Sequence, residues 1–414
     1  MTKKTRKQKK KTNSGNTHPQ KPVHILVECP DLIASVRVGV LEPLQPLVDK
    51  GICEVQFIKT LKIKKADIAW SDIFITVRGS DPITKEIVRI AKNAKRLIIY
   101  YLDDDLLNVP LESIVGTYYA DPDIQKNIQE LIGMSDVLWG VNRNIKEKYL
   151  PYTKGKWIEN KVPIRTNEFP KKKYISYHPL RILYAGSKDH EGLVREVLRN
   201  AVVRIAEEYK ENVEFVFVGV NPGIKGLENV FYYPYFDSYE AYREFIEQGD
   251  YAIGLGPGRD APFYACKYYN KFVEYASISA VGIFTKAEPY TQIVIDGKNG
   301  ILCGNTEEQW YEAIKGIIED NQIITQCRNN IRKQIAAEFE PNHIANSLIG
   351  QYPEFGTYHT ESVEIEDIPV SQTYVQYFLY RIKIILRQKG IRGIPEIMRK
   401  SFKTIQKFLI REIK

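Results

Sequence analysis

Short apolar runs alternate along the chain with longer segments whose apolar positions recur every three or four residues. Such runs are typical of buried strands, and such segments are typical of amphipathic helices. In the first half, the pattern predicts strands at 23–27, 54–58, 72–77, 96–101, 136–140 and 156–159. Helices are predicted at 36–49, 82–95 and 123–134. This alternation favours a parallel, doubly wound α/β sheet.

The same alternation restarts in the second half. Strands are predicted at 181–185, 213–218, 251–255 and 280–284, and helices at 193–209, up to 248 and at 307–319. Between the halves, 161–177 contains Pro163, Pro170 and a run of lysines, as is typical of a linker. We therefore expect two Rossmann-like domains, at 23–160 and 178–350, followed by a second linker at 351–370. In such sheets, ligands bind beyond the carboxyl ends of the strands.

Charge is distributed unevenly along the 414 residues. The whole chain carries +8, residues 1–22 carry +8 and residues 371–414 carry +9, so the body between them carries −9. An acidic body is not typical of a nucleic-acid-binding core. The basic ends instead indicate an anionic partner, such as a lipid surface, a polyanionic polymer or RNA. Residues 1–22 have the composition of a disordered tail.

The C-terminal segment 371–414 is predicted to be a basic, amphipathic helical extension. Between residues 391 and 414, apolar side chains recur with helical spacing and basic side chains lie between them. This pattern fits binding to an anionic membrane surface, with packing on the body or self-association as alternatives. The more apolar segment 374–386 is also compatible with core packing.

Several features favour a cytoplasmic protein. The five cysteines lack metal-ligand spacing and are typical of reduced thiols. No apolar run approaches the roughly 20 residues of a membrane span. The lysine-rich start also lacks the apolar core of a secretory signal. We expect a cytoplasmic location, with peripheral attachment to the inner face of the membrane if 391–414 binds lipid.

The most informative stretch is 260–276, where a proline-containing loop opens into a predicted helix. On this helix Lys267, Lys271 and Glu274 stand at i, i+4 and i+7, and so share one face. A helix N-terminus attracts anions, and two lysines strengthen a phosphate site. Glu274, further along, suits the hydroxyls of a ribose. On spacing alone, such a stripe is more often a solvated helix face.

The surrounding motifs resemble those of a known family. Asp260-Ala-Pro-Phe263 is followed by Lys-x3-Lys-Phe-x-Glu-Tyr-Ala, an apolar run at 280–284, Pro289-Tyr290 and Asp296-Gly-Lys-Asn-Gly-Ile-Leu302. In this order they resemble the donor half of retaining glycosyltransferases of the family 4-like group, which have the GT-B fold. The resemblance covers about 23–350. It implies two domains facing across a cleft and transfer of a sugar from a nucleotide-diphosphate sugar, with retention of anomeric configuration.

A second motif, Ala185-Gly-Ser-Lys-Asp-His-Glu-Gly-Leu193, is similar to a Gly-Ser-x-x-His-x-x-Asp-Leu segment in some branches of the family. The resemblance implies that Gly186 lets the backbone approach the diphosphate. It also implies that Ser187 reaches donor oxygens and that His190 acts at the reaction centre. Gly192 stands where the branch has Asp.

Two departures affect the donor site. Ser187 stands where the better-known version of the motif has Arg, and Cys266 stands where the family frequently has its first Glu. Compensation of the phosphate charge is therefore expected to fall more heavily on Lys267 and Lys271.

The acceptor side is less well defined. Asp103 and Asp104 belong to a run of three carboxylates at a predicted strand end, which is similar to an Asp-Asp-Asp-Leu signature of the same family. They are candidates for orienting the acceptor hydroxyl or supporting developing charge. Capping of the next turn is an alternative, and a metal site is disfavoured because GT-B enzymes usually need no metal. Arg37, Arg78 and Asp260 are further candidates for the cleft.

The sequence therefore predicts a hexosyl-type glycosyltransferase without cofactor or metal. Its expected partners are a nucleotide-diphosphate sugar and a cell-envelope glycan or lipid-linked acceptor, whereas nucleic acid is not expected. Another chemistry of the same fold, such as that of an epimerase or phosphorylase, is one alternative. A second is a non-catalytic GT-B-like scaffold that docks to membrane or nucleic acid through its basic ends.

Overall fold

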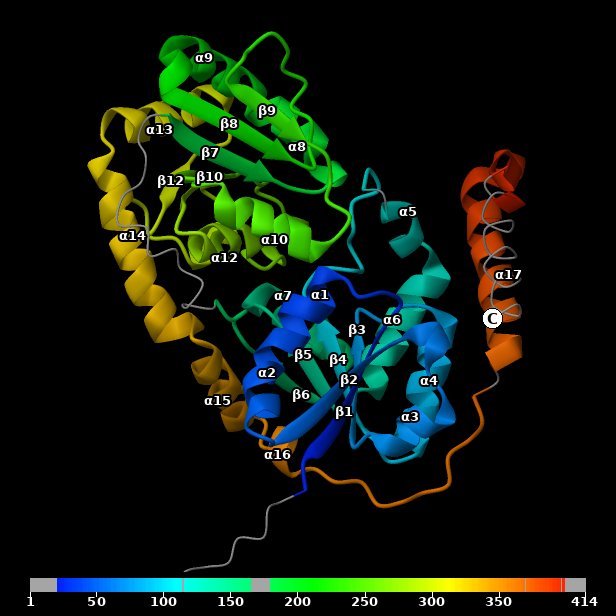
Figure 1. Ribbon diagram of the computed structural model, residues 1–414. Helices are drawn as coiled ribbons and strands as arrows, with labels where there is room; N and C mark the ends of the chain where they lie inside the picture. The colour runs from blue at the N-terminus through cyan, green and yellow to red at the C-terminus, as the bar shows by residue number, and fades with distance from the viewer. Residues whose placement is uncertain (1–20, 114, 165–178, 369, 396, 399–414) are drawn as a thin grey trace, which may run out of the picture.

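The computed structural model describes residues 21–113, 115–164, 179–368, 370–395 and 397–398, and shows two α/β domains (Figure 1). The predicted tail at 1–22 lies almost entirely outside the described residues. Most of the predicted linker at 161–177 and most of the basic end after residue 398 also lie outside them. The predictions for these segments stay predictions.

The first domain is built on a six-stranded parallel sheet with the order β2-β1-β3-β4-β5-β6. Its strands are β1 (Val23–Cys29), β2 (Cys53–Lys59), β3 (Ile73–Val77), β4 (Leu97–Leu102), β5 (Val137–Gly140) and β6 (Lys156–Glu159). Its helices are α1 (Ala34–Val36), the π-helical turn η1 (Arg37–Leu41), α2 (Glu42–Asp49), α3 (Lys65–Trp70), α4 (Pro82–Asn93), α5 (Gly116–Tyr119), α6 (Pro122–Met134) and α7 (Arg143–Tyr149). Every residue of β3, β4 and β5 is buried, which explains their continuous apolar runs.

The second domain repeats this plan with the strand order β12-β11-β10-β7-β8-β9. Its strands are β7 (Leu180–Ala185), β8 (Val213–Val218), β9 (Val230–Tyr233), β10 (Ile253–Gly256), β11 (Val281–Thr285) and β12 (Ile301–Cys303). Its helices are α8 (Glu191–Val197), α9 (Arg199–Tyr209), α10 (Tyr239–Gln248), α11 (Pro262–Ala265), α12 (Asn270–Ser277), α13 (Glu307–Glu319) and α14 (Gln322–Gln334). Its strands also pair in parallel. The prediction of two doubly wound parallel sheets is confirmed.

Each sheet has a point where the chain reverses its direction of travel across the strands. In the first sheet β1 lies between β2 and β3, and in the second β7 lies between β8 and β10. Loops that leave the carboxyl ends of such strands diverge and leave a crevice in which ligands bind. The relevant loops here follow β1, β3 and β4 in the first domain and β7, β8 and β10 in the second.

The C-terminal part of the chain returns from the second domain to the first. It continues through η8 (Ile335–Phe339), α15 (Pro341–Gln351), α16 (Glu354–Thr357) and α17 (Val370–Lys389). Figure 1 shows α14 and α15 running from one domain to the other, with α17 on the far side of the first domain. There α15 contacts α2, and α17 contacts α4. These segments thus cover two outer helices of the first domain.

Helix α17 is fixed by charge as well as by apolar contact. Lys383 and Arg387 each lie 2.9 Å from a carboxylate oxygen of Asp123 on α6. Ile384 and Ile385 are buried. The segment 374–386 therefore packs on the first domain in its described part. Among the described residues, no helix has the length and apolar character needed to cross a membrane.

Candidate functional site

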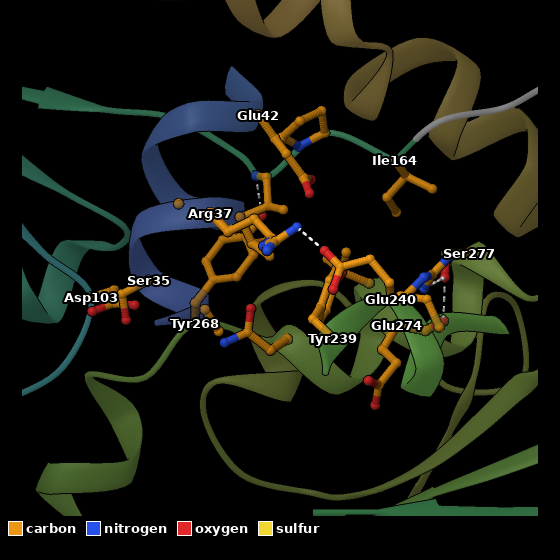
Figure 2. Close-up of a pocket in the computed structure, with 18 of the residues that line it drawn as sticks. Ser35, Arg37, Glu42, Asp103, Ile164, Tyr239, Glu240, Tyr268, Glu274 and Ser277 are labelled. Atoms are coloured by element: carbon orange, nitrogen blue, oxygen red, sulfur yellow. Dashed lines mark hydrogen bonds and ion pairs between the residues drawn. The ribbon is translucent and has the colours of Figure 1, made fainter. Parts of the chain in front are cut away.

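A cavity of about 590 Å³ lies between the two domains. It is bounded on one side by α1 and η1 and on the other by α10 and α12 (Figure 2). Across its mouth, Arg37 Nη1 lies 2.5 Å from Glu240 Oε1, and the Arg37 guanidinium lies 5.2 Å from the centre of the Tyr239 ring. Arg37, predicted to face the cleft, therefore does so and bridges it.

Arg78, Asp104 and Lys267 form a second bridge between the domains. Arg78 Nη2 lies 3.2 Å from Asp104 Oδ2, and Lys267 Nζ lies 3.3 Å from both carboxylate oxygens of Asp104. Arg78 has a φ of 55°, in the left-handed region, and its N–H donates to the carbonyl of Tyr101 at 3.0 Å. Burial lowers the pKa of Arg78, but Asp103 and Asp104 outweigh it and raise the pKa. The guanidinium therefore stays charged.

The three consecutive aspartates point to different partners. Asp103 lines the cavity, and burial raises its pKa. Its Oδ1 atom has no hydrogen-bond partner among the described residues, and the Nε atom of Arg78 lies 3.8 Å away. Asp105 is fully buried, accepts a bond from the Tyr149 hydroxyl at 2.7 Å and pairs with Lys148. Asp105 thus anchors the loop, while Asp103 and Asp104 face the cleft.

No group of three or more His, Cys, Asp or Glu side chains in the described part of the chain is arranged to hold a metal ion.

The prediction of one continuous helix carrying Lys267, Lys271 and Glu274 is wrong. Helix α11 ends at Ala265 and α12 begins at Asn270, so Lys267 lies in the connection between them. The side chain of Asn142, which follows β5, donates to the carbonyls of Cys266 at 2.9 Å and Lys267 at 3.0 Å. These carbonyls are thereby engaged by the first domain rather than by a following helical turn.

Lys271 and Glu274, by contrast, do share α12. The Lys271 ammonium donates to the carbonyl of Ala185 and lies 4.7 Å from the centre of the Tyr184 ring. Burial lowers the pKa of Lys271 below its ordinary value. Glu274 Oε1 accepts a 2.5 Å hydrogen bond from the Tyr242 hydroxyl on α10. Figure 2 shows the Glu274 carboxylate directed away from the Arg37–Glu240 pair.

The ends of β7 and β8 come close together at two glycines. Gly219 has a φ of 76°, and a side chain there would collide with the carbonyl oxygen of Gly186. The Gly186 N–H in turn donates to the carbonyl of Val218 at 3.0 Å. The ring of Tyr235, which is 75% exposed, stands beside Gly219. Gly186, Gly219 and the ring of Tyr235 therefore lie together at the carboxyl ends of β7 and β8, and we call this site the cradle.

The remaining predicted residues lie around this cradle, with one exception. Ser187 is exposed and precedes the short turn η5 (Lys188–His190). Burial, followed by the charges of Lys271 and Lys267, lowers the pKa of His190 to about 4. His190 is therefore neutral near pH 7 and close to both lysines. Asp260 is exposed and does not line the cavity.

Several residues of the site could not be found from the sequence motifs. Asn142 has the position expected of a helix cap, since it follows a buried strand and its Oδ1 accepts from the N–H of Ile145 at 3.0 Å. Asn144 donates to the carbonyl of Ala265 at 2.9 Å. Nothing in their local sequence indicates that they bind the other domain. In the sequence pattern, Tyr184 and Tyr242 look like ordinary apolar positions of a strand and a helix.

The sequence matches no protein-family model and no curated protein. Solved structures, however, share the arrangement of both domains. Anabaena HepE in complex with UDP-glucose superposes with a TM-score of 0.57 at 13% identity, covering 80% of this chain and 99% of HepE. Sucrose-phosphate synthase from Thermosynechococcus elongatus gives a TM-score of 0.59 at 12% identity, covering 80% and 98%. The chain has the GT-B fold.

A third similar structure limits what this fold can decide. A Listeria monocytogenes protein proposed to be a UDP-N-acetylglucosamine 2-epimerase gives a TM-score of 0.52 at 12% identity, covering 83% of this chain and all of that one. Unrelated reactions are thus carried by one architecture. The predicted fold is confirmed, and the reaction has to be argued from the site.

Proposed function

We propose that this protein is a retaining glycosyltransferase that moves a hexose from a nucleoside diphosphate sugar to a hydroxyl acceptor. The observation that carries the proposal is the position of Lys271 beside the cradle formed by Gly186 and Gly219, with Glu274 further along the same helix and lining the cavity. A buried cation beside exposed backbone suits a diphosphate, and a carboxylate further along the same helix suits ribose hydroxyls. The surrounding motifs resemble those of retaining enzymes, which supports retention.

The donor side would act mainly by electrostatic stabilisation. As the glycosidic bond loosens, negative charge grows on the departing diphosphate, and preorganised cations stabilise it strongly in a site that excludes water. Lys271 has no carboxylate in an ion pair with it among the described residues, so a diphosphate would supply its counter-charge. Lys267, which pairs with Asp104, would be shared between that carboxylate and the phosphate.

The acceptor would enter from the first domain. Asp103 lines the cavity, so its carboxylate is placed to accept a bond from an acceptor hydroxyl. Neutral His190 can donate a hydrogen bond without adding charge. The bridges from Arg37 to Glu240 and from Asp104 to Lys267 hold the cleft narrow, which limits access of water to the donor.

We further propose that the acceptor is a cell-envelope glycan or a lipid-linked saccharide at the cytoplasmic face of the membrane. The basic ends of the chain support this proposal. In the described part of the C-terminal segment, four large apolar side chains are exposed, namely Leu379, Leu386, Ile394 and Met398. Such side chains next to a basic segment suit peripheral binding to an anionic lipid surface.

A non-catalytic scaffold is the second candidate, and one observation favours it. Cys266, at the position where the family frequently has Glu, is fully buried, and its Sγ lies 3.9 Å from Asp105 Oδ2. This position therefore faces the interface between the domains and not the cavity. A donor contact of the family is replaced here by a structural one.

Nucleotide binding separates the two candidates. Calorimetry with UDP, GDP, ADP and TDP and their sugar conjugates should show binding of one nucleotide family to the wild-type protein. Lys271→Met should lose most of this affinity because it removes the buried cation. Lys298→Met provides a control, since Lys298 is exposed in the turn that precedes β12, at the opposite edge of the sheet. If all the nucleotides fail to bind, the glycosyltransferase proposal is contradicted and the scaffold is favoured.

A further inference from the structure

The hydroxyl of Tyr184 is a buried polar group that the fold leaves unsatisfied. Tyr184 lies near the end of β7 and is 1% exposed. Its hydroxyl oxygen makes no hydrogen bond to any described residue. Most buried polar side chains in proteins have a partner, and a hydroxyl without one destabilises the fold. The Tyr184 hydroxyl is therefore expected to lower the free energy of unfolding.

This hydroxyl lies at the backbone cradle. Tyr184 is the penultimate residue of β7, and Gly186 directly follows the strand. A Cβ atom on Gly186 would stand 2.6 Å from the Tyr184 hydroxyl oxygen. Glycine at 186 thus leaves room for the hydroxyl beside the backbone of the cradle.

The neighbours of the hydroxyl suit an anion. The Lys271 ammonium lies 4.7 Å from the centre of the Tyr184 ring, which places a positive charge beside the same space. Burial raises the pKa of Tyr184, and Tyr290 and Glu274 raise it further, so the hydroxyl keeps its proton and can donate it in a hydrogen bond. A buried hydroxyl donor and a partly buried cation therefore lie together at the carboxyl end of β7.

We propose that Tyr184 is a ligand-binding residue whose hydroxyl donates a hydrogen bond to a phosphate oxygen of the bound nucleoside diphosphate. This inference rests on the proposed function and adds a residue to the donor site. Ligand binding would supply the partner that the hydroxyl lacks. Neutral hydroxyl donors to charged oxygens make strong hydrogen bonds in sites that exclude water.

Tyr184→Phe tests the proposal because it removes the hydroxyl alone. The unliganded variant should melt at the same temperature as the wild type or higher, since an unsatisfied group has been removed. Its affinity for the nucleotide that binds best among UDP, GDP, ADP and TDP should fall by about tenfold or more. Affinity for the corresponding nucleoside, which has no phosphate, should stay unchanged. A structural role for the hydroxyl would give the opposite change in melting temperature.

Tyr251→Phe is the matched control. The Tyr251 hydroxyl also lacks a partner among the described residues, but its ring lies against Gly249, before the amino end of β10, whereas Tyr184 lies near the carboxyl end of the neighbouring strand β7. This variant should match Tyr184→Phe in stability and the wild type in nucleotide affinity.

Two results would overturn the inference. Equal nucleotide affinity of Tyr184→Phe and the wild type would show that the hydroxyl does not touch the ligand. A clear loss of stability in unliganded Tyr184→Phe would show that the hydroxyl has a structural partner. If the wild type binds none of the nucleotides, the proposed function fails first, and the inference fails with it.

Discussion

Glu28 lies near the carboxyl end of β1, and its carboxyl group is completely buried. It accepts hydrogen bonds from the hydroxyls of Thr60, Thr76 at 2.8 Å and Thr84 at 3.3 Å. Burial raises the pKa of Glu28 from 4.5 to about 7, although the bond from Thr60 opposes the shift. The folded protein therefore binds this proton more tightly than the unfolded chain does.

This difference predicts how stability depends on pH. Below about pH 4.5, Glu28 is protonated in both states, and above about pH 7 it is ionised in both. Between these values, the free energy of unfolding should fall as pH rises, by on the order of 3 kcal/mol. Urea unfolding from pH 4.5 to 8 should show this fall in the wild type and a flatter profile in Glu28→Gln.

Glu112→Gln is the control for this measurement, because Glu112 is an exposed loop carboxylate. It should follow the wild-type profile. If Glu28→Gln shows the same pH dependence as the wild type, proton uptake by Glu28 is not the cause.

At the scale of elements, the connection between α11 and α12 depends on a side chain from the other domain. Asn142 donates to the carbonyls of Cys266 and Lys267 and also caps α7 through its Oδ1 atom. Asn142→Asp keeps the capping oxygen but places a carboxylate oxygen against two carbonyls. Urea denaturation should show a loss of about 1–3 kcal/mol in the free energy of unfolding.

The same variant should weaken nucleotide binding, because the position of Lys267 depends on this connection. Asn330→Asp is the comparison, since Asn330 makes one exposed hydrogen bond, to the carbonyl of Lys298 at 3.0 Å. That change should alter stability by no more than about 0.5 kcal/mol. Equal stability of the two variants would show that Asn142 does not hold the connection.

The elements also show how far a sequence pattern reaches. Residues 156–159, 213–218 and 307–319 are β6, β8 and α13 with the predicted bounds, because buried strands and capped amphipathic helices are local patterns. The predicted helix at 193–209 is interrupted at Leu198. Strand β9 was missed because it is an edge strand whose aromatic side chains are largely exposed and do not alternate.

The candidate site, like the elements, was predictable only where it depends on local sequence motifs. Gly186 and Lys271 lie in motifs that are each contiguous in sequence, and the structure brings them together at the carboxyl end of β7. The break between α11 and α12 was not predictable, since Asn142 lies more than a hundred residues earlier and in the other domain. Local periodicity carries no information about such a contact.

At the scale of the whole molecule, two ion-pair bridges and the returning C-terminal helices hold the domains together. Arg37 pairs with Glu240 at the mouth of the cavity, and Asp104 pairs with Lys267 further in. Helices α14 and α15 run from the second domain to the first (Figure 1). The residues proposed to bind the donor and the acceptor therefore lie on opposite sides of one cleft.

Transfer of a sugar in this cleft can be followed by proton NMR of a nucleotide sugar incubated with the protein and cell-envelope glycans. We expect the wild type to release nucleoside diphosphate and to form a product with the anomeric configuration of the donor. Asp103→Asn should still bind the donor but lose transfer, whereas Lys271→Met should lose both. A wild-type protein that binds the nucleotide sugar but leaves it intact with every glycan would contradict the account and indicate a scaffold.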